Sequence, residues 1–243
     1  MTEEAKIIII VPGKWKTRTD FVQDIAQKSD GLLFAGLILM DTKTKEGFKA
    51  ELHPYDRNLA KTFSLAGGHS ISAHDIDDVK SHTFSLFVTG PGGSLAHAQK
   101  ILEIGCGLLR AGGIAVKVET TGKAHSAKDW LALAEAHNET ALYHAFVTLV
   151  GDKGTYYSCG MHNLGYRDAL VKGKLSANQA AAILQSFLLY TLIEKPTIKD
   201  GHTFSESATA PHYRLQSMGC TTYPKGHSFF NPYGMWRLEL MHN

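Results

Sequence analysis

The sequence has little cysteine, little arginine and no long apolar run. Its three cysteines include no CxxC pair, which is typical of a reducing compartment rather than of a disulfide framework. Only six of the 25 basic residues are Arg and the net charge is +2, which argues against nucleic acid as a partner. The longest apolar run, residues 32–40, is too short to cross a bilayer, and no secretory signal pattern opens the sequence. We therefore expect a cytoplasmic protein without nucleic-acid or membrane contacts.

The composition is that of a globular protein with a sizeable core. Hydrophobic residues make up 44% and charged residues 20% of the 243 residues. Apolar runs at 7–11, 32–40, 48–53 and 84–88 predict strands, with helical patterns after the first and third. This β-α-β-β-α-β order predicts an α+β fold, in which ferredoxin-like split elements extend into a larger mixed sheet with packed helices. We expect one domain over 1–243; the alternative is an N-terminal ferredoxin-like unit, 1–89, followed by 90–243.

Local signals place several later elements. The motifs Thr17-x-x-Asp20, Ser126-x-x-Asp129 and Ser176-x-x-Gln179 predict helix starts. The runs 141–150 and 155–161 predict a hairpin, and strands are expected at 212–217 and 235–241.

A glycine-rich loop follows the strand at 84–88. Gly92, Gly93 and Ser94 then lead into a helix, and such a loop can hold an anion on free backbone N–H groups. It lacks the lysine of a P-loop and the spacing of a dinucleotide fingerprint. The alternative is an ordinary strand-to-helix turn in which Ser94 caps the helix.

A second cluster surrounds a turn at Gly122. Lys117 and Glu119 share one face of a predicted strand, and Lys123 and His125 follow the turn. Such a group can bind an anion or exchange protons with a substrate. The alternative is a same-face salt bridge that contributes little energy.

A third cluster combines Cys159 and His162 with Asn163 and Asp168. A Cys–His pair can supply a nucleophile and a base, or half of a zinc site, and His202 lies on a later polar loop. The other interpretation is a buried, unreactive Cys159. Because the ligand set is incomplete, we predict neither a metal nor a cofactor.

Three segments resemble parts of a family of bacterial proteins grouped as a domain of unknown function. They are GGIAVKVE (112–119), YSCGMHNLG (157–165) and GHTFS (201–205). The resemblance covers about the second two-thirds of the chain and implies a bacterial cytoplasmic protein. It implies no reaction and no catalytic residue.

No catalytic motif is complete, so a non-catalytic protein-binding function, of an immunity or regulatory type, is favoured. An exposed patch of Tyr233, Trp236 and Arg237 would support a protein partner. One alternative is a hydrolase or transferase that uses the Lys, Glu, His and Cys candidates in one pocket on a small polar substrate. Another is a structural metal-binding protein. The apolar helix after Ser176 is compatible with a homo-oligomer.

Overall fold

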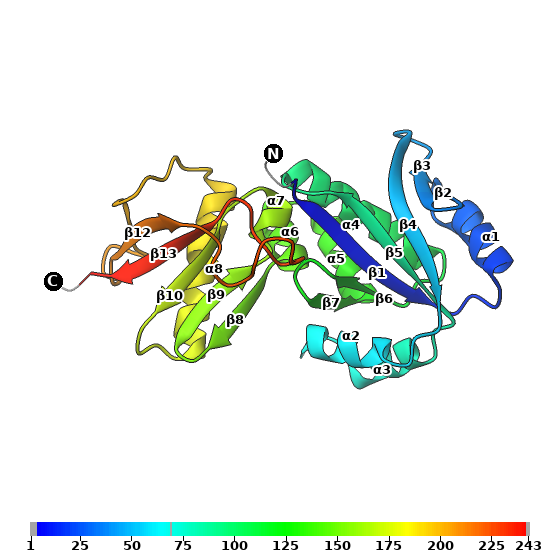
Figure 1. Ribbon diagram of the computed structural model, residues 1–243, viewed down its shortest axis with the longest axis horizontal. Coiled ribbons are helices and arrows are strands. Elements are labelled where there is room, and N and C mark those ends of the chain that lie inside the picture. Colours follow the sequence, from blue (N-terminus) through cyan, green and yellow to red (C-terminus); the bar gives the residue numbers. More distant parts are fainter. Residues whose placement is uncertain (1–3, 69, 242–243) are drawn as a thin grey trace.

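The computed structural model describes residues 4–68 and 70–241. Two β-sheets with packed helices form an α+β fold, as expected (Figure 1). The first sheet is antiparallel, in the order β2-β3-β4-β5-β1-β6-β7. Its strands are β1 (Lys6–Gly13), β2 (Leu32–Ala35), β3 (Ile38–Asp41), β4 (Glu46–Pro54), β5 (Phe84–Pro91), β6 (Ala115–Val118) and β7 (Lys123–Ser126).

The second sheet has the order β11-β12-β13-β10-β9-β8. Its strands are β8 (Thr148–Asp152), β9 (Thr155–Cys159), β10 (Asp168–Lys172), β11 (Thr203–Phe204), β12 (Tyr213–Met218) and β13 (Met235–Leu240). The neighbours β10 and β13 are parallel, with Asp168 paired to Met235. A segment late in the sequence therefore completes the middle of this sheet.

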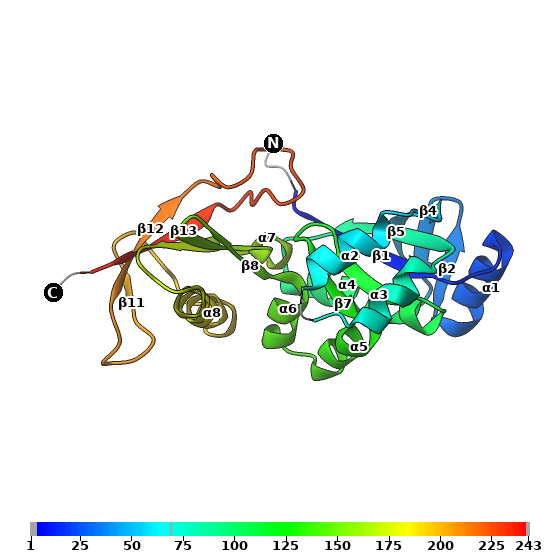
Figure 2. The same cartoon turned by 90° about the horizontal axis from the view of Figure 1, so that it is seen from below.

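Eight helices are described. They are α1 (Arg18–Lys28), α2 (Leu59–Gly67), α3 (Ala73–Lys80), α4 (Leu95–Arg110), α5 (Ala127–Ala136), α6 (Glu139–Phe146), α7 (Met161–Leu164) and α8 (Ala177–Ile193). The first sheet lies between α4 on one face and α2 and α3 on the other, whereas α8 covers one face of the second sheet (Figure 2). The short α6 and α7 lie where the two sheets approach each other.

The apolar run of β1 is continuous because the strand is covered on both faces. Ile7, Ile9 and Val11 belong to the core beneath α4, whereas Ile10 packs with α2 and α3. Buried side chains of both sheets belong to one hydrophobic cluster, which reaches from Ile7 to Leu238. The alternative boundary after residue 89 falls inside β5, and the first sheet continues to β7.

The predicted helix starts are confirmed. Thr17 and Ser176 form capping boxes with the residues three positions on, and the Ser126 hydroxyl accepts a bond from the N–H of Asp129. These signals are local, so the tertiary structure does not override them.

Three expectations about the strands need correction. Residues 32–40 form a hairpin rather than one strand, because Gly36 adopts φ +63° and turns the chain between β2 and β3. Residues 141–146 are helical, because the Asn138 side chain caps α6 by accepting from the N–H of Ala141. The strand order also differs from that of a ferredoxin-like split unit, because β5 lies between β4 and β1 and three strands separate β1 from β2.

Candidate functional site

The turn between β6 and β7 (residues 119–122) faces α7, and a pocket lies beside this contact. Gly160 allows the close approach, because it adopts φ +124° and a Cβ there would overlap the Phe146 carbonyl and the Thr121 side chain. The segments that carry two of the predicted clusters are therefore neighbours.

His162 is the unusual residue of this contact. It is 2% exposed, and neither of its ring nitrogens has a hydrogen-bond partner. The Thr121 hydroxyl is also buried without a partner, and these three atoms are all the unpartnered buried side-chain N and O atoms among residues 4–68 and 70–241. Burial lowers the pKa of His162 to about 4, so the ring is neutral at pH 7 and offers one donor and one acceptor. Unsatisfied buried polar atoms are rare and call for an explanation.

His162 lines a cavity of about 450 Å³. The start of β1, the 119–122 turn and the segment between β12 and β13 supply its other walls, with Glu4, Ala5, Lys6, Ile8, Thr120, Gly226, His227, Ser228, Phe230 and Pro232 as lining residues. Figures 1 and 2 show that the segment before β13 runs back from the second sheet past α7 towards the start of β1. We call residues 226–232 of this segment the roof.

Asp168 fixes the roof to α7. Its Oδ2 accepts from Asn231 Nδ2 at 2.7 Å, and its Oδ1 accepts from the Ser158 hydroxyl at 2.7 Å and from the N–H of Met161 at 3.3 Å. Asn231 Nδ2 also donates to the Tyr166 carbonyl at 3.0 Å. Desolvation outweighs these bonds and raises the pKa of Asp168 to about 6, which leaves the carboxyl mostly ionised at pH 7. Asp168 thus holds α7 and the roof, which form two of the pocket walls, without lining the pocket itself.

Asn163 and the glycine loop also belong to the frame of the pocket. The side-chain oxygen of Asn163 accepts from the Thr120 hydroxyl at 3.1 Å. The backbone carbonyl of Asn163 accepts from the N–H of Gly93 at 3.0 Å. The N–H of Gly92 donates to Ala5, and Ser94 caps α4 through the N–H of His97. The N–H groups of both glycines are therefore engaged within the protein, as in an ordinary strand-to-helix turn.

The second predicted cluster is divided between the two faces of a hairpin. Lys117 and Glu119 form an ion pair on the face that also carries Ile8. Because Val118 pairs with Lys123 and Val116 with His125, the latter two side chains lie on the opposite face. The prediction that Lys117 and Glu119 share a face is confirmed, but the four residues do not form one group.

Lys123 and His125 instead satisfy carbonyl groups at the end of α6. Lys123 Nζ donates to the Val147 carbonyl at 2.8 Å, and His125 Nε2 donates to the Ala145 carbonyl at 3.0 Å. Burial lowers the pKa of Lys123 to about 8 and that of His125 to about 4. Both side chains are engaged in packing β7 against α6.

Cys159 and His202 lie apart from these groups. Cys159 is 1% exposed, and burial raises the pKa of its thiol well above the usual range. His202 is exposed on the loop before β11, where its Nδ1 accepts from the N–H of Lys199 at 3.4 Å. Among the residues that the structure describes, no group of three or more His, Cys, Asp or Glu side chains is placed to hold a metal ion.

The aromatic patch that would support a protein partner does not form near the end of the sequence. Tyr233 is 38% exposed, but Trp236 is only 9% exposed and packs into the core. The guanidinium of Arg167 lies over the Trp236 ring at 5.2 Å. Because β13 packs Trp236 inward, Tyr233, Trp236 and Arg237 do not share one exposed patch.

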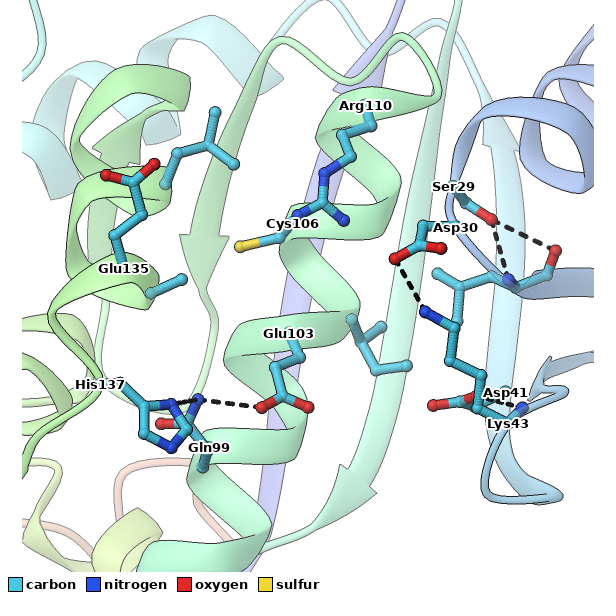
Figure 3. A pocket seen from close by; sticks show the side chains of 14 residues that line it. Ser29, Asp30, Asp41, Lys43, Gln99, Glu103, Cys106, Arg110, Glu135 and His137 are labelled. Carbon is cyan, nitrogen blue, oxygen red and sulfur yellow. Dashed lines mark hydrogen bonds and ion pairs between the residues drawn. The ribbon is translucent and has the colours of Figure 1, made fainter.

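A second groove, of about 350 Å³, lies between α4, the end of α5 and the loops around β2 (Figure 3). Lys43 pairs with Asp30 at 2.8 Å, and Gln99 donates to Glu103 and to His137, each at 3.0 Å. Buried Cys106 lies at its floor, where desolvation raises its pKa to about 11. This groove contains none of the residues predicted from the sequence.

The sequence interpretation missed three residues of the site: Thr120, Thr121 and Asn231. The threonines look like ordinary turn residues, and no local signal distinguishes them. Asn231 precedes Pro232 in a turn-rich segment, but its contact with Asp168 spans 63 residues.

Within the described ranges, every helix is too short or too polar to cross a membrane. No protein-family model matches the chain, and searches of curated proteins and of solved structures returned no match. The resemblance to a bacterial family of unknown function therefore stays a prediction.

Proposed function

We propose that this protein is a non-catalytic binding protein and that the His162 pocket holds its ligand. The observation that carries this proposal is the grouping of the unpartnered polar atoms described above. His162 Nδ1 and Nε2 and Thr121 Oγ1 all belong to two facing segments beside a cavity. A protein tolerates the cost of unsatisfied polar atoms where a ligand satisfies them.

The state of the candidate reactive groups supports binding over catalysis. The Cys159 thiol is buried and protonated at neutral pH, and the Thr120 hydroxyl is engaged by Asn163. Lys123 donates to a backbone carbonyl on the other side of the sheet. A hydrolase or transferase needs a nucleophile and a base that converge on one point, and these groups diverge.

A thermal-shift screen tests the proposal. The wild-type protein and the His162→Phe variant are heated with a library of small metabolites, both charged and uncharged. A ligand at about 100 times its dissociation constant adds about 2.7 kcal/mol of stability, or about 5–10 °C in Tm at this chain length. We expect at least one compound to give such a shift in the wild type and none in the variant.

The His137→Phe variant is the matched control, because His137 is exposed and lies in the other groove. It is expected to respond as the wild type does. A library in which no compound stabilises the wild type more than His162→Phe would contradict the proposal.

A second candidate function is self-association through the β2–β3 hairpin, which presents apolar side chains to solvent. Leu33, Ile38 and Met40 share its outer face, and their exposed fractions are 44%, 51% and 44%. Leu37, in the turn, is 62% exposed. At the edge of the sheet, the Ser29 hydroxyl donates to the Leu32 carbonyl and accepts from the Leu32 N–H. These backbone groups are therefore not free to pair with an added strand, and association through the apolar face of the hairpin is favoured. An apolar face is complementary to its own copy across a two-fold axis.

Sedimentation over a concentration series tests this association. We expect the wild type to form dimers as the concentration rises and Ile38→Lys to remain monomeric, because the new charge would be buried against apolar side chains. Leu65→Lys is the control, since Leu65 is 77% exposed on α2, away from the hairpin. A wild-type protein that stays monomeric throughout the series would rule out this function.

A further inference from the structure

We infer that a pocket around Arg167 is a second binding site, which takes a small monocarboxylate with an apolar or aromatic body. The pocket has a volume of about 480 Å³ and lies between the turn after α7, the end of α8 with the segment that follows it, and the start of β13. Its lining shares only Pro232 with that of the His162 pocket. It is therefore a different site from the one proposed above, and it is tested separately.

Arg167 is the only charged side chain among the described residues that line this pocket. It is half-buried, and within residues 4–68 and 70–241 it forms no ion pair. Its guanidinium makes a hydrogen bond from Nη1 to the Met218 carbonyl, which is long at 3.4 Å. A guanidinium has five N–H donors, so most of this hydrogen-bonding capacity is unused. A partly desolvated cation without a counter-ion favours an anionic ligand.

The carboxylates nearest to Arg167 are bonded elsewhere. Asp168 follows it in the sequence, but the Asp168 carboxyl is enclosed by its own donors. A hydrogen bond from the N–H of Ser217, at 2.6 Å, lowers the pKa of Asp200, and Arg167 adds only a minor Coulombic contribution. Neither aspartate lines the pocket. The position of a counter-ion in front of the guanidinium is therefore open to a ligand.

The contact between Arg167 and Trp236 prepares the guanidinium for a carboxylate. Its central carbon lies 5.2 Å from the centroid of the indole ring, and this cation–π contact holds the group at the pocket wall. A guanidinium that is held in place loses less entropy when it binds, and its parallel N–H groups match the two oxygens of a carboxylate. A single positive charge balances a monocarboxylate, whereas a phosphate dianion would bring a second charge without a partner.

The remaining walls fit an apolar or aromatic body. Tyr166, Pro196, Ile198 and Tyr233 line the pocket together with Trp236. Tyr233 is 38% exposed, so this wall is accessible from solvent. The volume falls within the range of small-molecule sites, and aromatic rings pack well against aromatic walls. We therefore expect the carboxylate at Arg167 and a ring or branched chain against the tyrosines.

Three compounds that share a phenyl ring test this site: benzoate, benzamide and phenyl phosphate. Each is titrated at pH 7 into the full-length ¹⁵N-labelled protein, and the indole N–H signals of its three tryptophans are followed. We expect benzoate to move the Trp236 signal and to bind at least about tenfold more tightly than benzamide, and also more tightly than phenyl phosphate. Trp15 and Trp130 donate their indole N–H to backbone carbonyls in the core, and their signals are expected to stay in place.

Variants of two arginines show which charge is responsible. Arg167→Met is expected to bind benzoate no better than benzamide, and Arg167→Lys, which keeps the charge without the paired N–H groups, to bind benzoate more weakly than the wild type. Arg237→Met is the matched control, because Arg237 is 43% exposed on the same sheet and already pairs with Glu239 at 3.1 Å. It is expected to bind benzoate as the wild type does.

Two comparisons in the wild type decide the matter even if a variant fails to fold. Benzamide that binds as tightly as benzoate would overturn the site, as would benzoate binding that persists in a folded Arg167→Met. Phenyl phosphate that binds as tightly as benzoate would overturn the carboxylate class. A ligand held by Arg167 stabilises His162→Phe as much as the wild type, so the metabolite screen distinguishes the two sites.

Discussion

Replacing Asp168 with asparagine is expected to lower the free energy of unfolding by about 3 kcal/mol. The Asp168 carboxylate accepts from the Ser158 hydroxyl and the Met161 N–H on one side and from Asn231 on the other. An asparagine amide must turn its NH₂ group towards one of these donors. Asn231 cannot adapt by flipping, because its Nδ2 also donates to Tyr166 and its Oδ1 accepts from the N–H of Tyr233. In the variant, the buried NH₂ group of the new asparagine therefore faces another hydrogen-bond donor, and neither has an acceptor.

Urea unfolding followed by circular dichroism measures this loss. Asp200→Asn is the control, because Asp200 is exposed and accepts a backbone N–H that an asparagine oxygen can also accept. Its change is expected to stay within about 0.5 kcal/mol. Hydrogen exchange should also show faster exchange in the roof of Asp168→Asn than in the wild type. Equal stability of the two variants would mean that Asp168 does not hold the roof.

Replacing His162 with phenylalanine is expected to raise the free energy of unfolding of the empty protein by about 1–2 kcal/mol and to abolish ligand binding. The substitution removes two buried polar atoms without partners and adds apolar surface beside a cavity. Most core substitutions destabilise, so a gain here would identify a residue retained for function rather than for stability.

His125→Phe is the matched control. His125 is buried like His162, and burial lowers the pKa of both rings to about 4. His125, however, donates to the Ala145 carbonyl, so its replacement leaves that carbonyl without this donor. We expect this variant to lose about 2 kcal/mol. If both variants lose stability equally, the imidazole of His162 makes stabilising contacts of its own and the ligand argument fails.

The acid dependence of stability gives an independent measure of the His162 substitution. The unfolded histidine takes up its proton near pH 6.5, whereas the folded ring resists protonation down to about pH 4. Between these values only the unfolded state gains the proton, so the wild type loses about 3 kcal/mol through His162 as the pH falls across this window. His162→Phe is expected to lose correspondingly less stability between pH 6.5 and 4.

The sequence predicted those parts of the fold that are specified locally. The apolar run of β1 and the caps at Thr17, Ser126 and Ser176 depend on residues a few positions apart, and all were confirmed. The strand order was not predictable in this way. Strand direction and neighbours depend on pairings such as that of Asp168 with Met235, which no local pattern encodes.

The site was predicted only in part, because some of its contacts join residues far apart in the sequence. The sequence indicated His162, Asn163 and Asp168 as candidates. The structure places His162 in the pocket wall, with Asn163 bonded to the lining residue Thr120 and Asp168 bonded to Asn231 of the roof. Composition could not distinguish His162 from His125, because the difference between them is a hydrogen bond to a carbonyl 20 residues away. The roof was missed because Asn231 and Asp168 are 63 residues apart in the sequence, and no local pattern links them.

The position of β13 determines when the pocket can exist during biosynthesis. The strand lies between β12 and β10, although it is the latest of the described strands to be synthesised. Until it has been made, β10 has an unpaired edge rich in buried apolar residues, which is a hazard for aggregation in a nascent chain. The roof directly precedes β13, and Asn231 reaches Asp168 at the point where β10 and β13 begin their pairing. A growing chain therefore closes the second sheet and the His162 pocket only after the roof and β13 have been made.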